Sequence, residues 1–194
     1  HVSTLKLVDT LDEQQMLEEL IEDTKPTLPP ECRELHYLFA TPFRYGAAYP
    51  NGSRFRRAGF TEGVFYASES PETAVAELAF YRLLFFAESP DTPWPANPGE
   101  YTAFSALYLT NAALDLTQAP YRTDKSLTHT SDYTSCQMLA DNARQAHIEI
   151  IRYTSVRDPD HGINIALLTC RAFAKPEPLA LLTWRIHLNS NGVQ

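Results

Sequence analysis

The spacing of apolar residues predicts two main helices. Residues 71–87 are apolar at almost every position, and Ser70 before them is a suitable N-cap, followed by a proline at the first helical position. A second helix is expected over residues 131–147, with Ser131 or Asp132 as its cap. Because apolar side chains surround the first helix, we expect it to be buried on nearly all sides.

Short runs of β-branched and aromatic residues predict strands between and around these helices. Between the first two strands lies a long segment, residues 41–63, that is rich in Gly, Pro, Arg and aromatic residues. Irregular segments of this length in a compact domain usually carry function. The mixture predicts an α+β fold with mixed or antiparallel sheets. The expected strands cover residues 35–39, 64–67, 101–109, 148–153, 163–170 and 179–188.

The N-terminal part of the chain has a different pattern. Apolar residues alternate with many acids in an amphipathic arrangement from about Thr10, and the segment KPTLPP at residues 25–30 ends the predicted helix. We therefore expect an N-terminal helical extension with a Pro-rich linker over residues 1–30, and one domain over residues 31–194.

Composition narrows the function classes. Apolar residues make up 44% of the 194 residues, which is typical of a globular protein, and the net charge of −8 argues against a nucleic-acid binder. No apolar run is long enough for a membrane span, and no segment resembles a signal peptide. The histidines lack metal-ligand spacing, so no metal is expected. Widely spaced Cys32, Cys136 and Cys170 predict a reduced, cytoplasmic protein.

One segment is basic within this acidic chain. Residues 43–60 contain Arg44, Arg54, Arg56 and Arg57 and no acid. Guanidinium groups bind phosphate oxygens in a bidentate manner, so the cluster favours a small anionic ligand. Solubility and ion pairing are the alternative explanation.

Glu77 is the most unusual residue of the first helix. Its neighbours on the same helix face are Thr73, Ala74, Phe80 and Tyr81. A carboxylate buried there costs several kcal/mol unless it is paired or bound to a ligand. Two interpretations stay open, a functional carboxylate and a structural pair with Arg82 or an arginine of the preceding loop.

Further candidates flank the predicted strands. Ser155 lies where a strand meets a loop, so its hydroxyl can reach a ligand; an ordinary turn serine is the alternative, which the local sequence favours. His161, Gly162 and Asn164 in the next turn could line the same pocket, and Phe55 or Tyr66 could stack on a base or a nicotinamide ring. The chain has no G-x-S-x-G, Walker or G-x-G-x-x-G motif.

Three segments together resemble a known family. They are GSRFRRAGFTEGVFYASESPETAVAE at residues 52–77, CQMLADNARQAH at 136–147 and IIRYTSVRDPDHGINIALL at 150–168. In this order they resemble the RES-domain family, the toxin half of bacterial RES–Xre toxin–antitoxin pairs. The resemblance covers roughly residues 35–188.

The resemblance implies roles for individual residues. Arg54, Glu77 and Ser155 would be the arginine, glutamate and serine for which the family is named, and Tyr66 the aromatic residue of the strand before the helix. The family is similar to ADP-ribosyltransferase toxins of the diphtheria-toxin type, and its members deplete NAD⁺. A single ADP-ribosyltransferase-like domain that uses NAD⁺ as substrate, without a cofactor, is therefore implied.

The chain departs from the family at the opening strand. Many members carry an arginine soon after the first aromatic of that strand, whereas here residues 37–40 have none and Arg44 follows. The phosphate contact is therefore open among Arg44, Arg54 and Arg56, and Asn164 is a further substrate-binding candidate.

The implied function is cleavage of the nicotinamide–ribose bond, by a glycohydrolase or a phosphorylase acting as a toxin. An ADP-ribosyltransferase with a macromolecular acceptor and a non-catalytic nucleotide-binding module are the alternatives. The implied partner is an Xre-like helix-turn-helix antitoxin that covers the active site and carries the DNA binding. A homo-oligomer within that complex is also expected.

Overall fold

The structure is a computed structural model that describes residues 7–44, 52–59 and 62–193. It contains four α-helices among these residues: α1 (Leu11–Thr24), α2 (Tyr37–Arg44), α3 (Pro71–Glu88) and α4 (Thr134–Gln145). Short 3-10 helices are η2 (Pro30–Cys32), η3 (Tyr121–Thr123), η4 (Lys125–Thr128) and η5 (Cys170–Ala172).

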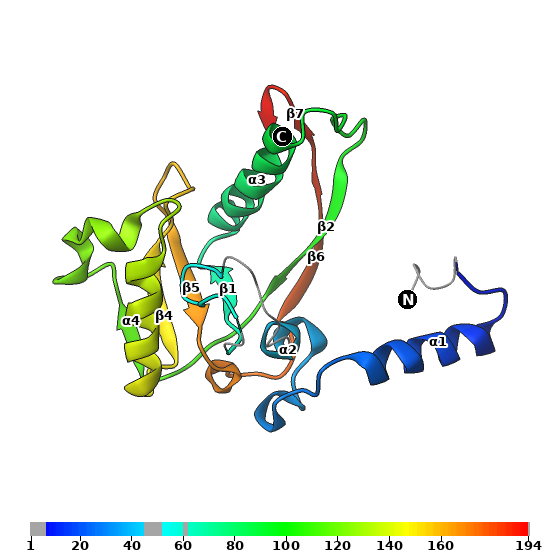
Figure 1. The fold of residues 1–194 in the computed structure, drawn as a ribbon, viewed down its shortest axis with the longest axis horizontal. Coiled ribbons are helices and arrows are strands. Elements are labelled where there is room, and N and C mark those ends of the chain that lie inside the picture. The colour runs from blue at the N-terminus through cyan, green and yellow to red at the C-terminus, as the bar shows by residue number, and fades with distance from the viewer. Residues whose placement is uncertain (1–6, 45–51, 60–61, 194) are drawn as a thin grey trace.

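The central sheet has the strand order β1-β5-β4-β3, and only the β3–β4 pair is parallel. Its strands are β1 (Phe65–Ser68), β5 (Ile163–Leu167), β4 (Ile150–Thr154) and β3 (Ala113–Asp115). A separate antiparallel ribbon pairs β2 (Gly99–Ser105) with β6 (Ala180–Ile186), and β7 (Leu188–Asn189) pairs with β8 (Gly192–Val193) (Figure 1). The predicted α+β class is confirmed.

The central sheet has an apolar core on each face. The register places Phe65, Ile165 and Ile150 on one face, and they pack with Phe39 of α2. On the opposite face Ile151 and Ala166 pack against α4 and against Phe55, which is fully buried. Each strand alternates its side chains between the two cores, as the period of two requires. Tyr66, Ser68, Tyr153 and Asn164 share the α4 face.

The first predicted strand is wrong. Residues 35–39 do not pair in a sheet, and helix α2 begins at Tyr37. Its stability comes from tertiary contacts: Phe39 and Ala40 are buried, and the Phe39 ring stacks on Phe173 at a centroid distance of 4.3 Å. The aromatic and aliphatic composition suggested a strand, but packing decides the conformation of so short a segment.

The expected burial of α3 is also wrong. Its N-cap at Ser70 and its length agree with the sequence prediction, but only Thr73 and Ala79 are buried. Tyr81 and Phe85 are about half exposed, at 53% and 49%. The β2–β6 ribbon is separated from α3 by a groove of about 720 Å³, which Ala74, Val75 and Leu78 of the helix line.

The remaining predicted elements form with shifted ends. The strands expected over residues 101–109 and 163–170 end at Ser105 and Leu167, and β3 was not predicted. Helix α4 begins three residues later than the prediction, and Asp132 Oδ1 accepts a hydrogen bond from the Thr134 N–H. Of the described helices, none combines the length and the apolar character needed to cross a membrane.

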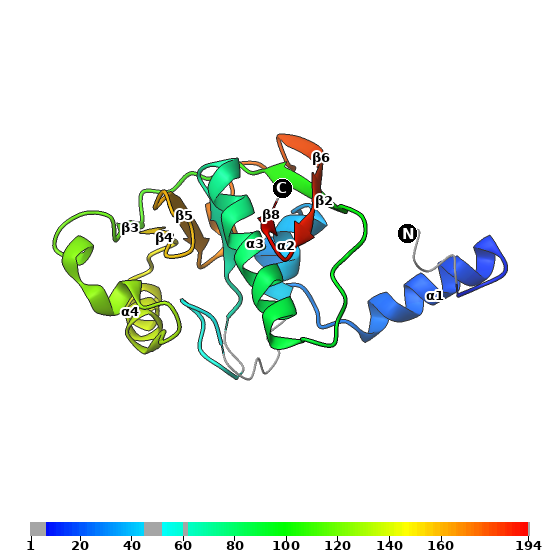
Figure 2. The same cartoon turned by 90° about the horizontal axis from the view of Figure 1, so that it is seen from above.

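The N-terminal extension forms the predicted helix, α1. Thr10 caps it through a capping box with Glu13, and no residue of α1 is buried. The helix projects away from the rest of the protein (Figures 1 and 2). Where the linker meets the domain, Arg44 donates hydrogen bonds to Glu22 and to the Pro26 carbonyl.

Two of the three cysteines differ from the expectation of reduced thiols. Cys32 and Cys170 form a disulfide that links η2 to η5 across 138 residues of sequence, and Cys136 is free and buried. The sequence could not indicate this pairing, because η2 and η5 come together only in the folded chain.

Candidate active site

Glu77 lies at the centre of a polar cluster on the α4 face of the sheet. Its Oε1 accepts hydrogen bonds from Ser155 Oγ at 2.7 Å and from Asn164 Nδ2 at 2.6 Å. Its Oε2 lies 4.0 Å from Nε of Arg157. The arginine beside Glu77 is therefore Arg157, whereas the sequence suggested Arg82 or the preceding loop. The side chain of Glu77 is 24% exposed, so the carboxylate is accessible to a ligand.

Asn164 is held in one orientation by its neighbours. It is buried on β5, opposite Ser68 of β1, and Ser68 Oγ donates to its Oδ1 at 2.6 Å. Because Oδ1 accepts from Ser68, the amide nitrogen is directed at Glu77. The predicted site residue Asn164 is thus brought to Glu77 and fixes Oε1.

Ser155 is fully buried and does not line the pocket that opens beside Glu77. Its Oγ accepts hydrogen bonds from the backbone N–H groups of Arg157 and Asp158 and donates to Glu77. The hydroxyl is therefore fully used within the protein. The structure brings Ser155 to Glu77, in a position that acts on the carboxylate rather than on the pocket.

The loop after Ser155 is tied to the first turn of α3. Asp158, predicted only as a turn residue, accepts hydrogen bonds from Thr73 Oγ1 at 2.7 Å and from the Gly162 N–H at 3.2 Å. The hydrogen bond from Thr73 is the main cause that lowers the pKa of Asp158, and the hydrogen bonds from the loop backbone lower it further. His161 and Gly162 were expected to line the pocket; they belong to this tie instead and are not among its described lining residues.

A pocket of about 340 Å³ opens beside Glu77. Four tyrosines line it together with Glu77 and two arginines. Burial raises the pKa of Tyr66 and Tyr153. Burial also raises the pKa of Tyr81, and with the smaller contribution of the neighbouring Tyr133 it reaches about 12. These hydroxyls are therefore neutral at physiological pH. The polar and aromatic lining residues are Ser53, Arg54, Tyr66, Ser68, Glu77, Tyr81, Tyr133, Tyr153, Arg157 and Asn164.

The loop after residue 51 contributes Arg54 to this pocket. Arg54 is 7% exposed, and its Nη1 and Nη2 donate to the carbonyl oxygens of Leu127 at 3.0 Å and His129 at 3.1 Å. Its guanidinium also lies 4.8 Å from the centroid of the Tyr133 ring. Arg54 thus holds the segment before α4 in place. Arg44, beside the linker, and Arg56 do not line the described pocket.

The two aromatic candidates have different environments. Tyr66 lines the pocket, and its hydroxyl accepts from the Phe55 N–H at 3.0 Å and contacts Ser53 Oγ at 2.9 Å. Phe55 is fully buried and packs edge-to-face against Tyr153 at 4.9 Å. The suggestion that Phe55 stacks on a ligand is therefore wrong, because its ring belongs to the core.

Sequence reasoning missed Arg157 and the tyrosines at positions 81, 133 and 153. Tyr81 follows Glu77 by four positions, and helical spacing placed it on the same face, but it was not assigned to the site. Arg157 follows Ser155 by two positions, which was the available signal for it. Tyr133 reaches the pocket from the segment before α4, and no local pattern indicates that.

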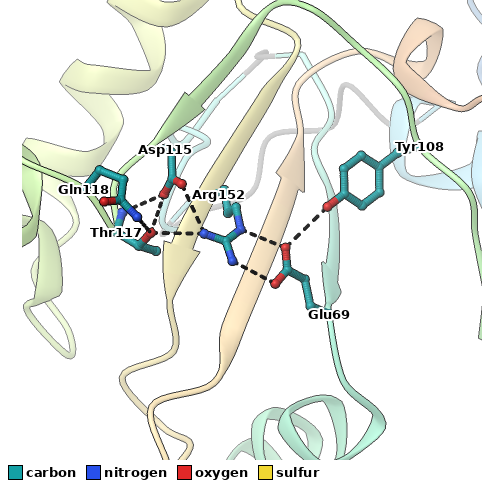
Figure 3. Close-up of polar contacts among 6 residues, drawn as sticks. All are labelled: Glu69, Tyr108, Asp115, Thr117, Gln118 and Arg152. Carbon is teal, nitrogen blue, oxygen red and sulfur yellow. Dashed lines mark hydrogen bonds and ion pairs between the residues drawn. The ribbon is translucent and has the colours of Figure 1, made fainter.

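The start of α3 is also held from the opposite face of the sheet. Arg152 of β4 donates to both carboxylate oxygens of Glu69, at 2.8 and 3.0 Å, one residue before the Ser70 cap (Figure 3). Its Nη1 donates to Asp115 Oδ2 at 3.1 Å and Thr117 Oγ1 at 3.0 Å. We refer to Glu69, Asp115, Thr117 and Arg152 as the Arg152 clamp.

Within the described part of the chain, no group of three or more His, Cys, Asp or Glu residues is arranged to hold a metal ion.

Comparisons with known proteins give one family. A search of curated proteins found no match to this chain. The model of the RES domain matches residues 28–189, which is most of the 194-residue chain and includes the whole Glu77 cluster. The chain therefore belongs to the RES-domain family.

Proposed function

We propose that this protein degrades NAD⁺ by cleaving its nicotinamide–ribose bond, as a glycohydrolase or phosphorylase, and acts as the toxin of a bacterial toxin–antitoxin pair. The RES-domain family is associated with toxin–antitoxin systems and with NAD⁺-related activity. The observation that carries the proposal is the state of Glu77. One carboxylate oxygen is held by Ser155 and Asn164, while the pocket beside it is lined by tyrosines.

The chemistry requires a carboxylate of this kind. When the bond between ribose C1′ and the ring nitrogen breaks, the electron pair goes to the ring, neutral nicotinamide leaves, and positive charge develops on the ribose. The Glu77 carboxylate stabilises that charge, and Oε2 is positioned to bind a ribose hydroxyl or the attacking water. Oxygen from water or phosphate then bonds to C1′, and with water one proton is released.

The other residues prepare the carboxylate and the pocket. Ser155 and Asn164 fix Oε1, so the rotation of the Glu77 carboxylate is restricted before the ligand arrives. Tyr66 and Tyr81 provide aromatic surface for the nicotinamide ring. The substrate itself carries the reactive bond, so the proposal includes no cofactor and no metal.

The test is turnover of NAD⁺ by the purified protein with analysis of the products. Nicotinamide plus ADP-ribose indicates hydrolysis, and a phosphate-dependent ADP-ribose 1″-phosphate indicates phosphorolysis. Glu77→Gln should lower kcat by at least about a hundredfold, on the scale of lost transition-state stabilisation. Glu88→Gln, the same change at an exposed position of α3, is the matched control and should keep the wild-type rate.

Three results would contradict the proposal. ADP-ribose attached to a protein or nucleic acid would indicate a transferase. NAD⁺ that binds to the folded protein and stays intact would indicate a binding module. A Glu77→Gln variant with the wild-type rate would make the carboxylate structural.

The proposed partner is an Xre-like helix-turn-helix antitoxin that covers the pocket. The exposed apolar side chains of α3 support this, because Phe80 and Tyr81 lie one turn beyond Glu77 and Phe85 continues the same surface. Phe85→Glu should prevent co-purification with an antitoxin encoded next to this gene while leaving NAD⁺ turnover unchanged. Retained binding by that variant would place the antitoxin elsewhere.

A further inference from the structure

We propose that Arg157 forms the anion-binding subsite of the pocket and contacts phosphate oxygens of the bound dinucleotide. The identity of the ligand rests on the proposed function. The assignment of Arg157 rests on its own contacts. Of the arginines considered from the sequence, Arg44 and Arg56 do not line the described pocket, and Arg54 donates to backbone carbonyls.

The hydrogen-bonding capacity of Arg157 is only partly used. A guanidinium has five N–H donors. Nη2 donates to Tyr133 Oη at 2.6 Å and to the Thr130 carbonyl at 3.1 Å. Nε is buried without a hydrogen-bond partner, and it lies 4.0 Å from Glu77 Oε2. Buried donors are nearly always satisfied in folded proteins, so an unsatisfied arginine that lines a pocket indicates a missing acceptor.

The guanidinium is held in place before any ligand binds. Its central carbon lies 4.5 Å from the Phe80 ring centroid and 4.9 Å from that of Tyr81, both on α3. The side chain is only 7% exposed. Although burial opposes the charge, the hydrogen bond to Tyr133 and the neighbouring Tyr81 raise the pKa of Arg157, so it stays cationic. A fixed, dehydrated cation loses little entropy when it binds an anion.

The other arginine of the pocket donates to the protein at both terminal nitrogens. Both terminal nitrogens of Arg54 donate to backbone carbonyls, and Nη1 also contacts Cys136 Sγ at 3.7 Å. Arg157 lies 4.0 Å from Glu77, so a phosphate bound to it is adjacent to the carboxylate that faces the ribose. In a dinucleotide the phosphate and the reactive ribose are likewise adjacent. The order of the two groups along the pocket therefore matches the order of the ligand.

The test compares ligands with and without phosphate. Calorimetry measures the Kd of ADP-ribose and of adenosine for wild type and for Arg157→Gln. We expect ADP-ribose to bind about tenfold to a hundredfold more weakly to the variant, the range for hydrogen bonds to charged groups. Adenosine should bind both proteins equally. Arg171→Gln, at an exposed arginine of η5, is the matched control and should change neither Kd.

A second readout separates a phosphate contact from an effect through Glu77. If Arg157 contacts phosphate, Arg157→Gln lowers kcat/KM for NAD⁺ but not for nicotinamide riboside, which has no phosphate. An equal loss with both substrates, or an unchanged Kd for ADP-ribose, overturns the inference. Should Arg157→Gln fail to fold, Arg157→Lys decides: it keeps the charge but loses the bidentate geometry, so ADP-ribose should bind measurably more weakly, by less than tenfold, with adenosine binding unchanged, and an unchanged Kd for ADP-ribose overturns the subsite.

Failure of the phosphate subsite at Arg157 can be distinguished from failure of the proposed function. If the wild-type protein does not cleave NAD⁺ but binds ADP-ribose through Arg157, the subsite stands and the activity is wrong. If the wild-type protein cleaves NAD⁺ and Arg157→Gln binds ADP-ribose normally, the activity stands and the subsite is wrong. Absence of ADP-ribose binding to the wild-type protein at millimolar concentration also overturns the subsite.

Discussion

Replacing Arg152 with methionine should destabilise the protein and release the start of α3. Methionine keeps most of the length of the side chain but removes every donor of the Arg152 clamp. Glu69 then loses its bidentate partner, and Asp115 loses its cation (Figure 3). Because Glu69 precedes the cap of α3, the contact joins β4 to the helix that carries Glu77.

The magnitude follows from the exposure of the groups. The side chains of Arg152 and Glu69 are 32% and 33% exposed, so solvent screens the pair and limits it to about 1 kcal/mol. The hydrogen bonds to Asp115 and Thr117 contribute roughly another 1 kcal/mol. We expect the free energy of unfolding to fall by about 2 kcal/mol and Tm by about 4–8 °C.

The loss of stability in Arg152→Met should become smaller as the pH falls. The hydrogen bond from Arg152, more than any other contact, lowers the pKa of Glu69 from its ordinary value of 4.5. A lowered pKa in the folded state means that the stabilisation is complete above pH 4.5 and is lost as the pH falls through the folded-state pKa. The difference in stability between wild type and Arg152→Met should therefore narrow below pH 4.5.

Urea unfolding of Glu69→Gln, Arg152→Met and the double variant measures the coupling energy between Glu69 and Arg152. We expect this coupling energy to be about 1 kcal/mol at neutral pH. The pair Arg185–Glu100 on the β2–β6 ribbon is the control, because its side chains are 74% and 63% exposed and its coupling should be near zero. A coupling at Glu69–Arg152 no larger than in the control, or a stability difference independent of pH, would refute the reasoning.

Three further perturbations test the rest of the fold. Phe39→Ala should lower the free energy of unfolding by about 3–5 kcal/mol in urea titrations, because this fully buried ring joins α2 to the core. Gly162→Ala should lower Tm and NAD⁺ turnover together, since an added Cβ would lie 1.9 Å from Thr73 Oγ1; unchanged activity would show that the loop is free to adjust. Reduction of the Cys32–Cys170 disulfide, or Cys32→Ser, should cost about 2–5 kcal/mol, and equal urea midpoints with and without dithiothreitol would contradict this.

The sequence was most informative where local signals agree. Helix α3 has an N-cap, a first-turn proline and a long apolar run, and its limits were predicted to within a residue. Helix α2 has no such signals, and its conformation depends on Phe173, which lies more than a hundred residues away in sequence. The exposure of α3 was not predictable either, because the position of the β2–β6 ribbon is set by long-range pairing.

The candidate site likewise contains residues that the sequence indicates and residues that only the fold brings together. Glu77 was found because a carboxylate conflicts with an apolar helix, and Asn164 because it lies in the turn that follows Ser155. Arg157 gives no conflict in the sequence: an arginine in a polar turn is ordinary. Only the folded chain places it between the rings of α3 and the Tyr133 hydroxyl, with its Nε left without a hydrogen-bond partner.

The position of Glu77 depends on contacts at the N-terminal end of its own helix. The first turn of α3 is fixed from one face of the sheet by Glu69 and Arg152, and from the other by Thr73 and Asp158. A helix that is exposed over most of its length has few other contacts to set its direction. The geometry at the carboxylate therefore depends on two polar ties more than on packing. Substitutions in either tie should reduce kcat more than they raise KM, because they move the carboxylate without touching the pocket wall.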